Sequence, residues 1–189
     1  MDFTDYVITD LQVSRFGHYL IFMSLQRSLC IERYTSLESM FAARQKQDYT
    51  DDKNYKKKYY GIRDMQRVKN ELLADSRVFL SPHDDTLFIS NKGSLWESNK
   101  SLKELLEDEK NSTIDLNLFK RHIVVQREDI IALTNCHDGI VFFTSLKTNG
   151  VLGAFDLVAK KVLAVKTGLP AGRHEYSYNS MTNELVVQH

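Results

Sequence analysis

The chain has 189 residues, of which 42% are hydrophobic and 26% are charged. This is the composition of an ordinary folded domain, and it excludes a chain that is disordered throughout. The 25 basic and 25 acidic residues leave a formal net charge of zero. A balanced charge argues against a protein whose main role is to coat nucleic acid or an anionic membrane.

The N-terminal stretch MDFTDYVITD lacks the apolar core of a secretory signal. No apolar run approaches the roughly 20 residues of a membrane-spanning helix. The two cysteines, Cys30 and Cys136, lie in or beside apolar strand-like runs, and we expect them to be buried, reduced thiols. The sequence thus predicts an intracellular protein of the nucleus or cytoplasm that makes no membrane contact.

Residues 7–34 predict three short strands, because β-branched, aromatic and other apolar residues dominate and polar turns separate the runs. Residues 36–75 differ and read as a helical insertion. The run from Ser36 has helical spacing at Leu37, Met40 and Phe41. A polar stretch without aliphatic residues follows and predicts a loop, and the run from Ile62 predicts an amphipathic helix. We treat residues 42–75 as a basic and helical insertion within a single domain, 1–189.

Residues 77–97 return to strands, and residues 100–110 predict a short acidic helix that packs through Leu102, Leu105 and Leu106. Residues 111–121 read as a polar connection. From residue 122 onward one apolar run follows another, and the whole chain contains about thirteen predicted strands. The predicted fold class is therefore mainly β.

A strand–turn–strand unit recurs along the chain, and self-similarity at such a spacing is typical of repeat architectures. Its copies are Thr9–Ser24, Ser76–Ser90, His122–Cys136 and His174–Gln188.

The run VLGAFDLVAKKVLAVKTG resembles the two outer strands of a WD-repeat β-propeller blade. The aromatic–Asp pair Phe155-Asp156 ends one strand, and the turn Ala159-Lys160-Lys161 leads to the next. The resemblance implies propeller-like blades of antiparallel strands. Closed propellers need four to eight such blades, whereas this chain supplies strands for about three. An incomplete ring would leave sheet edges and an apolar end face uncovered, so we expect a protein partner or self-association. An α+β domain or another β-rich domain is the alternative.

The sequence contains no phosphate-binding glycine loop, no nucleophile elbow and no metalloprotease helix. The most polar clusters are Pro82–Asp85 and Cys136–Gly139. Their Asp and His residues could in principle form an acid–base or metal site, but both clusters lie between predicted strands and favour turns. We predict a protein that is not an enzyme and that needs no metal or cofactor.

The best candidate for binding is a basic and aromatic segment, in which cations and rings alternate. Its predicted binding residues are Lys53, Tyr55, Lys56, Lys57, Lys58, Tyr59, Tyr60, Arg63 and Arg67. We predict a non-catalytic interaction or scaffold subunit of a larger complex that docks through strand edges and residues 42–75. The alternative is a nucleic-acid-binding accessory protein that uses Lys53–Lys69, since interleaved Lys and Tyr neutralise phosphates and stack on bases.

Overall fold

The computed structural model describes residues 8–14, 16, 18–24, 28–63, 77–91, 94–123, 130–137, 139–145, 150–169, 175–179, 182 and 184–188. In this part of the chain the structure is mainly antiparallel β-sheet, with two α-helices, which confirms the predicted fold class. Neither helix has the length and apolar character needed to cross a membrane.

The first sheet has the strand order β1-β2-β3-β4-β8. Neighbouring strands are antiparallel except for β4 and β8, which run parallel. The bounds are Ile8–Val13 for β1, Tyr19–Ser24 for β2, Ser28–Arg33 for β3, Lys56–Arg63 for β4 and Thr113–Asp115 for β8.

The second sheet has the order β5-β6-β7-β9, the third has the order β10-β11-β12-β13, and β14 pairs with β15. The bounds in the second sheet are Val78–Leu80, Leu87–Asn91, Ser94–Glu97 and Lys120–Ile123. In the third sheet they are Ile130–His137, Ile140–Ser145, Gly150–Asp156 and Lys161–Leu169, and the last hairpin comprises Glu175–Asn179 and Glu184–Gln188.

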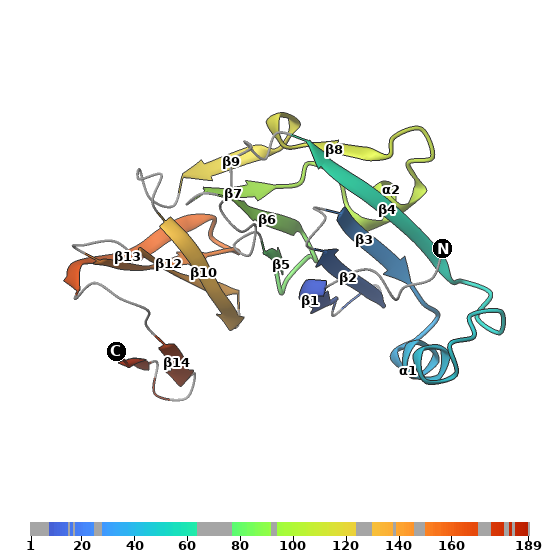
Figure 1. Ribbon diagram of the computed structural model, residues 1–189, viewed down its shortest axis with the longest axis horizontal. Coiled ribbons are helices and arrows are strands. Elements are labelled where there is room, and N and C mark those ends of the chain that lie inside the picture. Colours follow the sequence, from blue (N-terminus) through green and yellow to red (C-terminus); the bar gives the residue numbers. More distant parts are fainter. Residues whose placement is uncertain are drawn as a thin grey trace.

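The second and third sheets, and the first four strands of the first sheet, are each a four-stranded antiparallel arrangement in chain order. This is the topology of propeller blades. Figure 1 shows the sheets side by side in the order of the sequence, from β1–β4 through β5–β9 to β10–β13. The predicted propeller-like architecture is therefore present in the described part of the chain.

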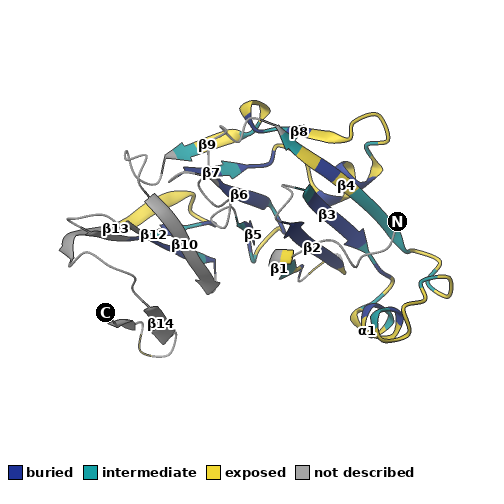
Figure 2. Cartoon of the chain, viewed as in Figure 1, coloured by how far each residue is buried: buried dark blue, intermediate teal, exposed yellow. Residues whose placement is uncertain are grey.

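Apolar side chains pack between the sheets. One cluster joins the first sheet to the second and includes Ile21, Ile31, Val78 and Ile89. Another joins the opposite face of the second sheet to the third, and it is centred on aromatic residues such as Phe88 and Phe143. Strands β5 and β6 are thus buried on both faces, which explains their apolar runs. Figure 2 shows β2, β3 and β6 largely in the colour of buried residues.

Helix α1, Leu37–Lys46, covers the outer face of the first sheet. It begins with a capping box, in which Ser36 and Ser39 each accept a hydrogen bond from the other's backbone N–H. Its Met40 and Ala43 pack on Leu20, Phe22 and other buried residues of β2 and β3. In the described part of the chain, α1 thus covers the part of this sheet face that β2 and β3 form.

The predicted loop and helix between residues 48 and 75 need correction. Residues 56–63 form β4, which pairs with β3 along its length. This strand is rich in Lys and Tyr and lacks the alternation of aliphatic and polar residues by which strands are predicted, so the sequence did not indicate it. Ile62 and Arg63, predicted to open a helix, end this strand, and residues 64–76 lie outside the described residues.

Two further predictions in the central part of the chain are revised. The predicted connection 111–121 contains β8, the short 3-10 helix η2 at Leu116–Leu118 and the start of β9. The proposed unit His122–Cys136 is not a hairpin, because β9 belongs to the second sheet and β10 to the third. Sequence alone cannot distinguish a hairpin from a passage between sheets. The predicted acidic helix is confirmed as α2, Leu102–Glu107, with the three expected leucines buried.

A substitution at Gly153 tests how closely the third sheet packs around Phe143. A Cβ at this position would lie 2.1 Å from Cζ of Phe143, a buried ring of the cluster between the sheets. We expect Gly153→Ala to lower the free energy of unfolding by about 1–3 kcal/mol through overpacking, measured by urea denaturation. The matched control is Gly61→Ala, whose added Cβ would have its nearest neighbour, the Ser112 oxygen, at 4.0 Å. Equal stabilities of the two variants would contradict this packing.

Candidate protein-binding surface

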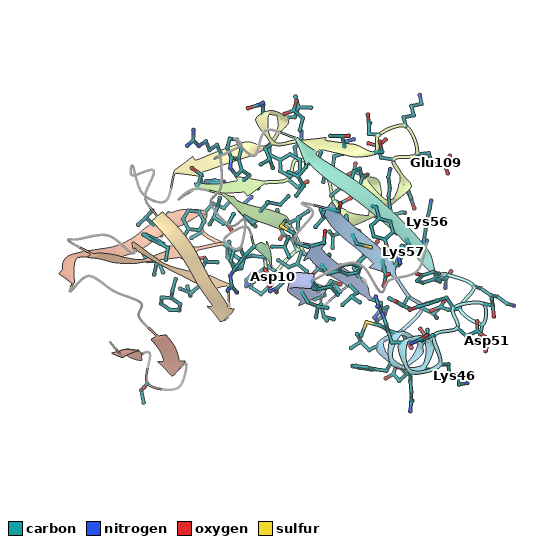
Figure 3. The ribbon with its side chains drawn as sticks, viewed as in Figure 1. Asp10, Lys46, Asp51, Lys56, Lys57 and Glu109 are labelled. Carbon is teal, nitrogen blue, oxygen red and sulfur yellow. The ribbon has the colours of Figure 1, made fainter. Side chains whose placement is uncertain are left out.

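The predicted basic segment follows the two faces of β4. In the register with β3, Lys57 is opposite Glu32 and Tyr59 is opposite Cys30, so these side chains share the face that α1 covers. Lys58 and Tyr60 lie on the other face, where Tyr60 joins the cluster between the first and second sheets. Figure 3 shows Lys56 and Lys57 along this strand.

Lys57 belongs to a buried ion cluster. The carboxylate of Glu32 is completely buried, and its Oε1 lies 3.2 Å from the Lys57 ammonium. Its Oε2 accepts hydrogen bonds from the Arg44 guanidinium and, at 2.6 Å, from the Tyr34 hydroxyl. A buried carboxylate must be compensated by charge and hydrogen bonds. The buried Glu32 carboxylate of β3 is therefore joined to α1 through Arg44 and to β4 through Lys57.

The predicted aromatic residues are mostly occupied by internal packing. Tyr55 stacks on Tyr49 with ring centroids 4.6 Å apart. Tyr60 is buried and donates its hydroxyl to the carbonyl of Leu105, and burial raises its pKa to about 12. The Lys58 ammonium lies 4.6 Å from the centroid of the Tyr60 ring, and desolvation lowers the pKa of this lysine.

The described members of the predicted binding segment lie on both faces of β4 and in the connection before it. Lys53 is exposed, Lys56 is partly exposed, and Tyr59 is 39% exposed. For Arg63 only the backbone, at the end of β4, is described, and Arg67 lies outside the described residues.

A different surface emerges at the start of the chain. Ile8, Leu11 and Val13 of β1 are 46%, 49% and 43% exposed, and we call these three residues the β1 strip. In the pairing with β2, Leu11 is opposite Phe22 and Val13 is opposite Leu20. The strip therefore continues the apolar face that α1 buries on the neighbouring strands. Figure 2 shows the contrast between exposed β1 and buried β2.

Two hydrogen bonds fix the position of β1. Asp10 accepts the backbone N–H of Val78 at 2.8 Å, and Asp85 accepts that of Phe16 at 3.1 Å, so β1 and its turn are tied to the second sheet. Phe16 itself is 65% exposed and follows the strip in the turn. A rigidly held apolar surface loses little conformational entropy on binding.

Helix α1 adds a second exposed apolar pair. Of the three apolar residues that predicted the helix, Met40 is buried, whereas Leu37 is 39% and Phe41 is 67% exposed. Sequence reasoning missed both exposed sets, because an apolar residue in a strand or helix is normally assigned to the core.

The predicted polar clusters behave as turns where they are described. Asp85 donates its backbone N–H to Ser81, and Asp84 accepts the N–H of Thr86. Gly139 has a φ of 83°, and a Cβ there would lie 3.0 Å from the Pro82 ring, so the two turns approach each other. Asp138 lies outside the described residues, and among the described ones no group of His, Cys, Asp and Glu is arranged to hold a metal.

Comparisons with known proteins find similarity among solved structures alone. No family model matches the chain, and no curated protein matches it. The chain is similar to the crystal structure of the β-propeller domain of Myceliophteria thermophila Cps50 (Swd1), with a TM-score of 0.47 and 13% identity. The similarity covers 95% of this chain and 48% of that one, so this chain spans about half the length of that domain.

The Glu32 cluster predicts a large loss of stability in a conservative variant. Glu32→Gln leaves the charges of Arg44 and Lys57 without their buried partner. We expect the free energy of unfolding to fall by about 3 kcal/mol, measured by urea denaturation. Lys46→Gln, in the exposed last turn of α1, is the control and should change it by less than about 0.5 kcal/mol. An unchanged stability of Glu32→Gln would mean that the cluster does not hold α1.

The hydrogen bonds of Asp52 predict that the stability of the protein depends on pH. Partial burial would raise its pKa, but hydrogen bonds from Thr35, Ser39 and Asn54 outweigh this and lower the pKa from 3.8 to about 2. Because the folded-state pKa lies below the unfolded one, the carboxylate stabilises the fold above about pH 4, and this is lost as the pH falls through about 2.

We therefore expect Asp52→Asn to have a lower free energy of unfolding than the wild type at pH 7. The difference between the two free energies should be smaller at pH 2, as measured by urea denaturation across this range. Asp51→Asn, at an exposed neighbour in the same connection, is the control and should match the wild type at both values. If the free energies of unfolding of Asp52→Asn and the wild type differed by the same amount at every pH, the assigned pKa would be contradicted.

Proposed function

We propose that this chain is a non-catalytic protein-interaction module, a scaffold subunit that docks a protein partner on the β1 strip. The observation that carries the proposal is the exposure of Ile8, Leu11 and Val13 on a sheet face whose continuation is core. Exposed apolar side chains that gather at one place are typical of interaction sites.

The rigid attachment of β1 to the second sheet supports this function. The backbone N–H of Val78 donates to Asp10 of β1, and the backbone N–H of Phe16 donates to Asp85 after β5, so hydrogen bonds in both directions join β1 and its turn to the second sheet. The exposed ring of Phe16 extends the strip, and aromatic residues are enriched among those that dominate binding energy.

The proposal is tested by affinity purification of three tagged chains. The double variant Leu11→Lys, Val13→Lys changes exposed side chains, so we expect an unchanged fold and the loss of proteins that co-purify with the wild type. The control is Leu118→Lys, which replaces a side chain that is 71% exposed on η2. Circular dichroism verifies that the variants fold.

The outcomes separate the alternatives. Proteins retained by wild type and control but absent from the double variant support docking on the strip. The same proteins in all three samples would overturn it. Loss from the control as well would show a general effect of added charge, and would also overturn it.

A further inference from the structure

We infer that two copies of this chain associate through β15, with the two strands paired antiparallel in one continuous sheet. This contact is separate from the β1 strip, so the inference goes beyond the proposed function. It follows from the number of strands in each sheet, the pairing of the equivalent strands and the register of the last hairpin.

The last hairpin is half of the unit that repeats along the chain. The second and third sheets, and the first four strands of the first sheet, are units of four antiparallel strands in chain order, whereas β14 and β15 form a sheet of two. The hairpin follows β13 in the sequence, and Figure 1 shows β14 beyond the third sheet. It thus has the place of the first two strands of a further unit. A two-stranded sheet is only marginally stable in water without additional strands or packing.

The second strand of each four-stranded unit has antiparallel neighbours on both edges. Strand β2 lies between β1 and β3, β6 lies between β5 and β7, and β11 lies between β10 and β12. Strand β15 has the same place in its unit, but within the described residues it pairs with β14 alone. Its second edge therefore offers backbone donors and acceptors to an antiparallel strand of another chain.

The residues of β15 suit pairing with the same strand of a second copy. The pairing is centred on Val186, which lies opposite Val186 of the other copy. Leu185 is then opposite Val187, and Glu184 is opposite Gln188. Glu184 is the only charged residue of the strand, so no like charges meet. Two hairpins joined in this way form four antiparallel strands, the number in each of the other units. The contact is isologous, as in most two-subunit proteins.

The same register joins the apolar faces of the two hairpins. Within one hairpin, apolar residues are opposite each other, Tyr176 with Val187 and Tyr178 with Leu185. Opposite residues share a face of a sheet, and alternate residues of a strand lie on opposite faces. Because Leu185 of one copy is opposite Val187 of the other, these positions fall on one face of the four-stranded sheet. A shift by one residue would continue the apolar face of one hairpin with the polar face of the other.

A change of charge at Val186 tests the inference in the full chain. The wild type should have a mass of twice 21.9 kDa in size-exclusion chromatography with light scattering. Val186→Asp and Val186→Lys each place like charges directly opposite each other, so either variant alone should be a monomer. An equimolar mixture of the two variants pairs opposite charges and should restore the dimer. This restoration would also show that both variants fold.

Two controls separate this contact from other effects of charge. Ser177 of β14 is opposite Val186 within the hairpin, one strand away from the contact between copies. Ser177→Asp and Ser177→Lys should therefore remain dimers. The double variant Leu11→Lys, Val13→Lys should also remain a dimer, so that docking on the β1 strip and self-association are measured independently.

The other outcomes overturn the inference. A monomeric wild type would do so in favour of a strand from another protein at this edge. Dimers of Val186→Asp or Val186→Lys alone would place the contact elsewhere, and a mixture that stays monomeric would contradict pairing centred on Val186. Loss of the dimer in the Ser177 variants would show a general effect of charge, and its loss in Leu11→Lys, Val13→Lys would assign self-association to the β1 strip. Failure through the wild type, the Val186 variants or the Ser177 variants would leave the proposed docking of a protein partner on the strip intact.

Discussion

The arrangement of the first sheet depends on a single buried carboxylate. Glu32 is fully enclosed between α1 and β4, and it is compensated by Arg44 from the helix and Lys57 from the strand. Loss of either cation would leave charge in an apolar environment, so the cluster fixes both elements on β3 at once. The position of α1 then decides which part of the sheet face is core and which part stays exposed.

The remaining architecture follows from the burial of apolar area between sheets. Each interface uses alternate residues of the same strands, with Val78 and Ile89 on one face of the second sheet and Phe79 and Phe88 on the other. A stack of this kind has two ends. At the first end α1 acts as a substitute for a further blade, which limits the stacking that an incomplete propeller would otherwise invite.

Helix α1 covers only part of the apolar face of the first sheet, and the uncovered part is the surface on which we propose that a partner docks. The helix buries the apolar side chains that β2 and β3 place on this face. Those of β1 stay exposed, even though Leu11 and Phe22 are paired neighbours on the same face. Hydrogen bonds to the second sheet hold the exposed strip in place, and Leu37 and Phe41 of α1 are exposed as well. These features together support the proposed docking surface, whereas Lys57, Tyr55 and Tyr60 of the basic segment make internal contacts.

The sequence by itself determined the strands with apolar runs, the turns between them, α1 and α2, and the strand–turn–strand units other than His122–Cys136. These features depend on local spacing and turn chemistry, which a sequence displays directly. The tertiary structure alone decided that the Lys- and Tyr-rich run is β4, because its stability comes from pairing with β3 and from Glu32, a residue far away in the sequence. It also decided that Leu11 and Phe41 are exposed, since the same apolar residue is core or surface according to what another part of the chain places over it.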